Sequence, residues 1–201
     1  MDYNGGTVIV MGGKDCFAIA SDFRFGLDNV TKDNKTPKIF KIHEKLFVGI
    51  IGLFSDICST RQSLEYKTSL YSFKKSAKIK PLAFSTILSN FLYQHRFAPF
   101  LVETITAGFD EKGNIFIESK DILGASSLAS NYAAIGTCSE SLYGICEVFW
   151  KPNMNNEELL KIISNCLTLG LNRNCISGWG GIVHIVSSKE ITTKIIRTRM
   201  D

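Results

Sequence analysis

The chain has 201 residues, of which 45% are apolar and 21% charged, and its net charge is +4. This balance is typical of a globular protein with a sizeable core, and it excludes a disordered chain or a strongly basic binder of nucleic acid. The dense basic run over residues 74–80 is interpreted as the solvated end of a helix.

Two apolar runs, over residues 7–11 and 17–21, are joined by Gly12-Gly13-Lys14-Asp15 and predict a β-hairpin. A third strand is expected over 46–51. These runs are continuous rather than alternating, which is typical of strands that are covered on both faces.

Two helices are predicted next, over 55–75 and from Pro81, where apolar residues recur at i, i+3 and i+4. Strands follow over 104–109, 115–118 and 132–135. Thr137-Cys-Ser-Glu140 is interpreted as a capping box that opens a third helix, and a fourth is expected near Asn155, with Glu158 three residues on. A last hairpin is predicted over 181–186 and 191–196.

Helices that arrive in pairs do not form the crossovers of a parallel sheet. The order therefore predicts an α+β fold in which two antiparallel sheets stack between helix pairs, a four-layer α-β-β-α sandwich. No linker or repeat is visible, and we expect a single domain over 1–201.

Thr7 raises a question of chemistry because it follows Gly5-Gly6 at the mouth of the first strand. A cut after Gly6 would leave Thr7 with a hydroxyl nucleophile and a free α-amine, which is one known arrangement for nucleophilic catalysis.

Five stretches, in this order, carry a family resemblance. They are Ser21-Asp-Phe-Arg24, Lys38-Ile-Phe40, Gly49-Ile-Ile-Gly52, Gly136-Thr-Cys-Ser139 and Asn172-Arg-Asn-Cys-Ile-Ser-Gly178. Together they resemble the β-type subunits of the proteasome core particle, which are N-terminal-nucleophile hydrolases with the four-layer fold. Tyr3-Asn-Gly-Gly6, Lys151-Pro-Asn-Met154 and Arg197-Thr-Arg-Met-Asp201 are most similar to one non-catalytic type of these subunits.

The resemblance implies a role for each matching residue. In active members a processed threonine is the nucleophile, and the positions that match its Asp, Lys and oxyanion glycine are Asp22, Lys38 and Gly52 here. A cation beside the amine disfavours its protonation, and a fixed N–H stabilises developing negative charge. The remaining positions of the set are Thr137, Asn174 and Ser177.

Spacing separates this chain from the active members. Their nucleophile precedes the Asp by sixteen residues, the Lys by thirty-two and the Gly by forty-six, and all three counts end on Gly6 here. Thr7 is one residue away, which in a strand places a side chain on the opposite face. We therefore expect Thr7 to be a strand threonine and the nucleophile to be absent.

Three further departures agree with this interpretation. The second acidic position is Asn174, and the serine position is Thr137. The leader, residues 1–6, is shorter than the propeptides of active members. We expect a non-catalytic subunit in which the Asp22–Lys38 pair is structural.

Two alternatives stay open. In the first, a bulge in the first strand restores the register and Thr7 is an active nucleophile. In the second, the chain forms a homo-oligomeric, self-compartmentalising particle.

Asp121 is the remaining candidate. The resemblance implies that it lines, with Ala125, the substrate cleft of the neighbouring beta type-2 subunit, where a carboxylate suits basic side chains. A solvated loop acid is the equal alternative.

The resemblance also implies partners: other β subunits in a heteroheptameric ring, α-type subunits and the opposing β ring. No secretory start and no apolar run of roughly 18 residues is visible, so we expect a soluble protein of cytoplasm and nucleus. Neither a C-x-x-C pair nor a metal-ligand spacing of the histidines is present. We expect no cofactor or metal, and reduced, buried cysteines.

Overall fold

The computed structural model describes residues 4–188 and 190–200. These residues form four helices and twelve strands in a mixed α/β fold. In chain order the elements are β1 (Thr7–Gly12), β2 (Cys16–Asp22), β3 (Phe25–Leu27), β4 (Val30–Asp33), β5 (Ile39–His43), β6 (Leu46–Gly52), α1 (Phe54–Lys75), α2 (Pro81–Gln94), β7 (Val102–Phe109), β8 (Ile115–Lys120), β9 (Ser126–Ala129), β10 (Tyr132–Gly136), α3 (Ser139–Phe149), α4 (Asn156–Leu171), β11 (Gly181–Ser187) and β12 (Ile191–Ile196).

Two five-stranded sheets carry the fold, and every strand pair in them is antiparallel. The first sheet has the order β10-β1-β2-β11-β12, and the second has the order β5-β6-β7-β8-β9. The short strands β3 and β4 form a separate hairpin. Strands β1, β2 and β6 are buried along their whole length, as their continuous apolar runs predict.

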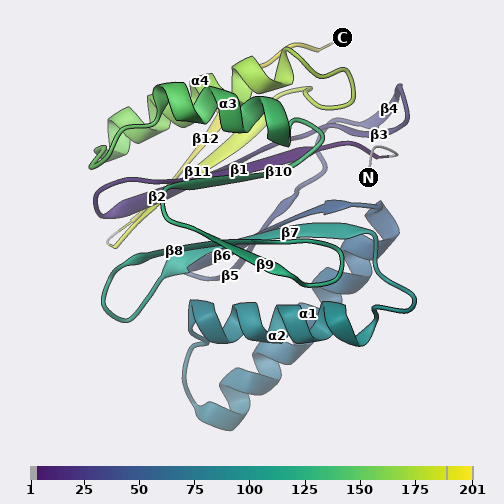
Figure 1. Cartoon of the computed structure of the whole chain (residues 1–201), viewed down its shortest axis with the longest axis vertical. Helices are drawn as coiled ribbons and strands as arrows, with labels where there is room; N and C mark the ends of the chain where they lie inside the picture. Colours follow the sequence, from purple (N-terminus) through teal and green to yellow (C-terminus); the bar gives the residue numbers. More distant parts are fainter. Residues whose placement is uncertain (1–3, 189, 201) are drawn as a thin grey trace.

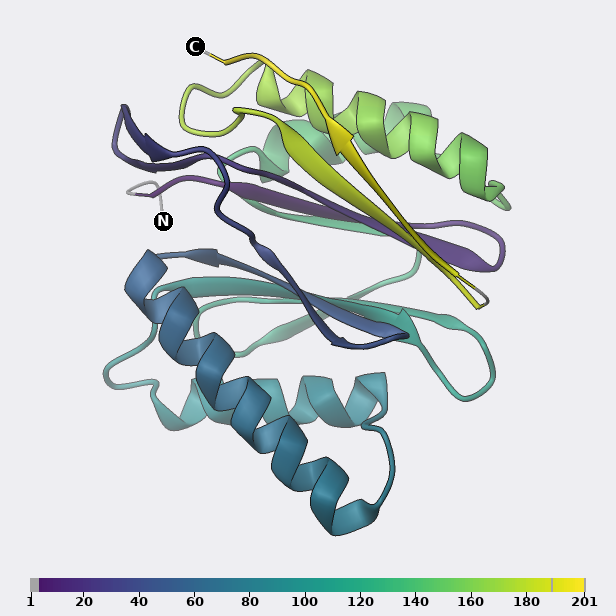
Figure 2. The ribbon, with the colours of Figure 1, turned by 180° about the vertical axis from the view of Figure 1, so that it is seen from behind.

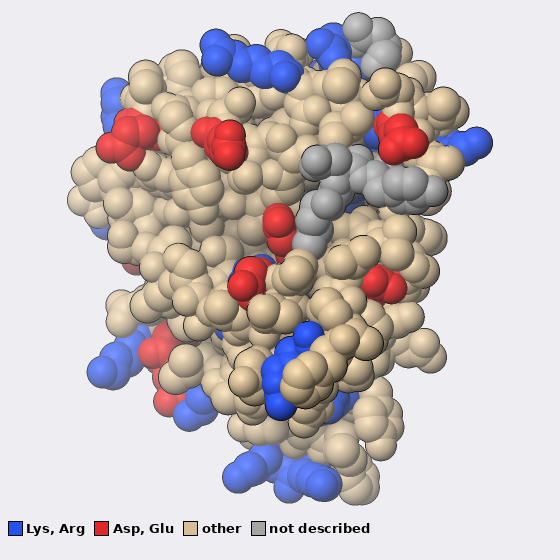
Figure 3. Space-filling model, turned by 45° about the vertical axis from the view of Figure 1, so that its right-hand side comes forward, with Lys and Arg blue, Asp and Glu red and all other residues tan. Residues whose placement is uncertain are grey.

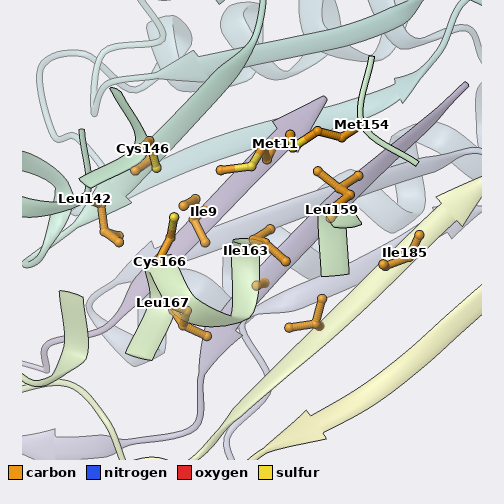
Figure 4. Close-up of a cluster of buried hydrophobic side chains, with 14 of the residues drawn as sticks. Ile9, Met11, Leu142, Cys146, Met154, Leu159, Ile163, Cys166, Leu167 and Ile185 are labelled. Atoms are coloured by element: carbon orange, nitrogen blue, oxygen red, sulfur yellow. The ribbon is translucent and has the colours of Figure 1, made fainter. Parts of the chain in front are cut away.

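Figures 1 and 2 show the helices as two pairs outside the two sheets, with α3 and α4 on the first sheet and α1 and α2 on the second. Side-chain alternation along β1 links these layers. Val8 and Val10 join the apolar cluster between the sheets, whereas Ile9 and Met11 join the cluster beneath α3 and α4. Figure 4 shows the second of these clusters. A third cluster lies between the second sheet and α1 and α2.

Local sequence explains where three of the helices begin or end. Pro81 is the first residue of α2, where its missing N–H costs nothing. Helix α4 begins after Asn155, whose N–H donates to the Glu158 carboxylate at 3.2 Å. Helix α1 ends at Lys75, and the next residue, Ser76, has a left-handed φ of 50°.

The expected antiparallel sheets and helix pairs are confirmed, but four strands were not predicted. These are β3, β4, β5 and β9. They have three to five residues, most of which are exposed or only partly buried. They therefore lack the long apolar runs from which the other strands were predicted.

Two local predictions are wrong. Helix α3 begins at Ser139 after Cys138 and has no side-chain cap, because the Thr137 hydroxyl bonds elsewhere, as described below. Cys58 and Cys175 are exposed, whereas the other four cysteines are buried.

The basic run over 74–80 forms the end of α1 and the following turn, and its lysines are exposed. Figure 3 shows Lys and Arg side chains gathered at the lower end of the molecule, where this turn lies. Lys78 pairs with Glu44 and Lys80 with Glu111. Among the described helices, none combines the length and apolarity that crossing a membrane requires.

Candidate functional site

Asp22 and Lys38 form a buried ion pair at the end of β2. The Lys38 Nζ lies 2.6 Å from Asp22 Oδ1, and the two side chains are 5% and 0% exposed. The ammonium also donates to the backbone carbonyls of Arg24, at 2.7 Å, and Asp22, at 3.3 Å. Burial lowers the pKa of Lys38, and the adjacent Asp22 carboxylate opposes this shift. Three acceptors thus hold the lysine in one place.

The Asp22 carboxylate joins three further segments. Its Oδ1 accepts the Thr7 backbone N–H at 2.9 Å, and its Oδ2 accepts the Gly178 N–H at 3.1 Å. The carboxylate therefore fixes the start of β1 and the loop before β11, in addition to Lys38. This satisfies a buried charge that would otherwise be costly.

Gly6 lies directly against Lys38. A Cβ placed on Gly6 would be 2.7 Å from Lys38 Cε and 3.1 Å from Nζ. The φ of Gly6 is +123°, a conformation that residues with a side chain rarely adopt. A side chain at position 6 would thus point at the lysine, and this chain has none there.

Thr7 is fully buried, and its hydroxyl has no hydrogen-bond partner. It precedes Ile9 and Met11 by even steps, so it shares the face of β1 that α3 and α4 cover. The pairing of β1 with β10 begins at Thr7 and continues one residue at a time to Met11, and the pairing with β2 is equally regular. The bulge that would turn Thr7 toward Lys38 is therefore absent from β1.

Thr137, Cys138, Asn174 and Ser177 form a second polar cluster. The Asn174 Nδ2 donates to Thr137 Oγ1 at 2.6 Å and to Cys138 Sγ at 3.1 Å, and that sulfur lies 3.0 Å from Ser177 Oγ. The backbone N–H and the hydroxyl of Thr137 donate to the Gly6 carbonyl, at 3.1 and 3.4 Å. The cluster is connected to Gly6 through that carbonyl, and the Asn174 amide takes part as a donor.

Gly52 ends β6, and one residue, Leu53, separates it from the start of α1. Its φ is +133°, and a Cβ there would be 2.0 Å from the Leu101 carbonyl oxygen. Only glycine fits this position, which is a structural reason for the residue that does not depend on catalysis.

Asp121 and Ala125 lie apart from these residues, in an exposed turn after β8. The Asp121 Oδ1 accepts the backbone N–H groups of Leu123 and Ala125 at 2.9 and 2.8 Å. Its other carboxylate oxygen has no partner among the described residues. The turn therefore holds the Asp121 carboxylate in a fixed position and leaves its second oxygen available to a partner.

Sequence reasoning missed two residues that hold the site together. Arg24 is 1% exposed and donates to Thr31 Oγ1, at 3.1 Å, and to the carbonyls of Asp28 and Ile176, at 2.8 and 2.9 Å. Asn4 is 6% exposed and bonds to two separate elements. No local pattern predicts either role. Asn4 bonds to residues 22 and 50 positions away, and Arg24 bonds to Ile176 as well as to the nearby Asp28 and Thr31.

The described residues contain no group of three or more His, Cys, Asp or Glu side chains placed to hold a metal ion. The site thus consists of one ion pair, one polar cluster and three glycines, Gly5, Gly6 and Gly52, with positive φ angles.

Comparison with known proteins identifies the family of this chain. Residues 2–186 match the family described as "Proteasome subunit". The chain belongs to the proteasome subunit family. Full-length relatives include proteasome subunit beta type-3-B of Arabidopsis thaliana, which is 42% identical over 200 residues, covering 100% of this chain and 98% of the relative. Proteasome subunit beta type-3 of Drosophila melanogaster is 39% identical, covering 99% and 98%.

The similarity extends to fungi. The probable proteasome subunit beta type-3 of Schizosaccharomyces pombe is 35% identical over 201 residues, covering 100% of this chain and 98% of the relative. All three relatives carry the beta type-3 name, in agreement with the subtype that the two ends of the sequence and residues 151–154 resemble. As a proteasome subunit, the chain assembles with other proteasome subunits.

Proposed function

We propose that this chain is a non-catalytic beta type-3 subunit of the 20S proteasome core particle. The observation that carries the proposal is the contact between Gly6 and Lys38, because the position that faces the lysine has no side chain. The particle is a threonine-type endopeptidase whose chemistry belongs to other β subunits. In this proposal the particle carries out ubiquitin-dependent protein degradation in the cytoplasm and nucleus.

The layered arrangement of helices and sheets supports the four-layer sandwich of the N-terminal-nucleophile hydrolases. In this proposal residues 1–201 form one domain, and residues 1–6 are an unprocessed leader. Asn4, Gly5 and Gly6 of that leader are buried, and Met1–Tyr3 lie outside the described residues. The ion pair Asp22–Lys38 then acts as a structural tie between strands.

The partners in this proposal are β subunits of a heteroheptameric ring, α-type subunits and the opposing β ring. The surface supports extensive contacts. Tyr66, Leu70 and Phe73 recur at i, i+4 and i+7 along the outer face of α1, and they are 68%, 37% and 86% exposed. Apolar side chains gathered on one helix face suit permanent interfaces.

Asp121 contributes, in this proposal, to the substrate cleft of the neighbouring beta type-2 subunit. The turn holds one oxygen of the carboxylate and leaves the other free for a cationic side chain, with which it would form a charge-assisted hydrogen bond. Ala125 forms the adjacent wall. Asp121→Asn is expected to slow cleavage after basic residues by the particle and to leave cleavage after apolar residues unchanged.

Two other functions are weighed against this one. An active subunit that uses Thr7 requires its hydroxyl to reach a base, but that hydroxyl is buried on the opposite face and has no partner. A homo-oligomeric particle built from chains with glycine at position 6 would have no nucleophile in this site.

Purified particles test the proposal through composition and labelling. A covalent probe for N-terminal threonines is expected to label other β subunits and to leave this chain unlabelled. Particles made of this chain alone, or label on Thr7, would contradict the proposal.

A further inference from the structure

Asn4 holds together two elements that share no strand pairing. Its Nδ2 donates to the Gly26 carbonyl in β3 at 2.7 Å, and its Oδ1 accepts the Phe54 N–H at 3.1 Å. The side-chain amide of asparagine has the same donor and acceptor as a peptide group. It therefore satisfies one backbone acceptor and one backbone donor, as an extended segment would.

The bond to Phe54 replaces a missing helix cap. Phe54 is the first residue of α1, and the preceding Leu53 has no side chain that can cap the helix. The first N–H groups of a helix need partners from outside its own hydrogen-bond ladder. Asn4, fifty residues earlier in the chain, supplies one. The rings of Phe25 in β3 and Phe54 in α1 also pack against each other, with their centroids 4.8 Å apart.

The next two residues fit only as glycines. A Cβ on Gly5, whose φ is +67°, would lie 2.1 Å from the Ile176 carbonyl oxygen. Gly6 is similarly confined by Lys38, and its carbonyl accepts two bonds from Thr137. Both residues are buried. Each of the three residues is thus held by a different part of the site.

We propose that residues 4–6 form a strap that covers the site around the Asp22–Lys38 pair, and that the two hydrogen bonds of Asn4 hold this strap in place. The inference rests on the proposed function and deepens it, since the site then lacks activity for two separate reasons. It has no nucleophile at Gly6, and the space in front of Lys38 is filled by the chain's own backbone. The strap also shields the Gly6–Thr7 bond from removal of the leader.

The test uses assembled particles that carry Asn4→Ala, with Asn34→Ala as the matched control, because Asn34 is exposed and its side chain has no hydrogen bond to any residue that the structure describes. Hydrogen exchange at the Phe54 amide is expected to rise roughly tenfold in Asn4→Ala, the effect of losing about one buried hydrogen bond. Trimming of the leader by an added aminopeptidase, followed by intact mass, is expected to reach Thr7 faster. Asn34→Ala is expected to match the unmodified chain in both assays.

A second variant keeps the test decisive if Asn4→Ala fails to assemble. Asn4→Asp retains the acceptor for Phe54 but loses the donor to Gly26, so it is expected to speed trimming and to leave Phe54 protected. Unchanged exchange and trimming in whichever Asn4 variant assembles would overturn the strap while the proposed function stands. An unmodified chain that already begins at Thr7 would overturn the proposed function itself.

Discussion

Two buried lysine–carboxylate pairs lie in different layers of the molecule, and their surroundings differ. Asp22–Lys38 lies at the site, where the lysine meets three acceptors and the carboxylate also accepts two backbone N–H groups. Glu118–Lys120 lies on β8, where Lys120 Nζ is 3.2 Å from Glu118 Oε1. Among the described residues, this carboxylate is the one partner of Lys120. Ser85 of α2 donates to the other oxygen of Glu118.

Burial lowers the pKa of both lysines, and the adjacent carboxylate opposes the shift in each. Burial thus acts on the two lysines in the same direction, and the pairs differ in the number of segments that each one joins. Asp22 and Lys38 tie together β1, β2 and the loop before β11. These ties give the pair a structural role that does not depend on catalysis.

The largest expected effect comes from breaking the first pair. Asp22→Ala leaves the N–H groups of Thr7 and Gly178 without their acceptor and the buried Lys38 ammonium without its carboxylate. The loss is expected to be about 3–5 kcal/mol in the free energy of unfolding, the range for breaking a buried ion pair. Urea unfolding followed by tryptophan fluorescence measures it.

Glu118→Ala is the matched change in the second pair. It leaves the buried Lys120 ammonium and the Ser85 hydroxyl without their carboxylate but frees no backbone N–H, so a loss near the lower end of the same range, about 3 kcal/mol, is expected. Equal losses in the two variants would break the comparison, because the extra segments held by Asp22 would then contribute nothing.

Gly6→Ala tests the space in front of Lys38. The added Cβ would displace the end of a side chain that three acceptors hold, and it would also adopt a strained φ. A loss of about 1–3 kcal/mol in the free energy of unfolding is expected. Gly113→Ala is the control, since Gly113 has a φ of +80° and nothing within 4 Å of the added carbon. If both variants lose the same stability, Lys38 does not confine position 6.

Asn174→Asp restores a carboxylate to the second cluster. The new side chain cannot donate to Thr137 Oγ1 or Cys138 Sγ, so a loss of about 0.5–1.5 kcal/mol in the free energy of unfolding is expected. No peptidase activity is expected to appear in this chain, because the residue facing Lys38 is still Gly6. Labelling by a threonine-directed probe would contradict that expectation.

The smallest effect concerns a surface pair that serves as a reference for the two buried ones. A hydrogen bond to Glu147 raises the pKa of Tyr132 from 10.0 to about 12. Between these pH values the unfolded chain loses the proton first, so the folded state binds more protons and stability falls as pH rises. Between these pH values the free energy of unfolding is expected to fall less in Tyr132→Phe than in the unmodified chain. An identical alkaline profile in both chains would contradict the shift.

Much of the fold could be predicted because long apolar runs determine it. The runs over 7–11, 17–21 and 46–51 became β1, β2 and β6, and the helical series from Pro81 became α2. The strands β3, β4, β5 and β9 could not be predicted, because they are short and lie at edges or outside the main sheets. Their pairing depends on tertiary contacts that no local pattern encodes.

The site could be predicted in part for a similar reason. Spacing was sufficient to place Gly6 rather than Thr7 opposite Lys38, since side chains alternate along a strand. The capping box at Thr137 was wrong because the hydroxyl donates to Gly6, 131 residues away, and accepts from Asn174. The bonds of Asn4 to Gly26 and Phe54, and of Arg24 to Ile176, join segments far apart in the chain, so no local pattern could predict them.

The intact mass of this chain, taken from its native assembly, tests the central claim most directly. A mass that includes Asn4, Gly5 and Gly6 is expected, because the residue facing Lys38 has no nucleophile and the leader is held in the site. Loss or acetylation of Met1 would not affect this conclusion. A chain that begins at Thr7 would mean that the leader is removed and that Thr7 gains a free amine, which would contradict the account.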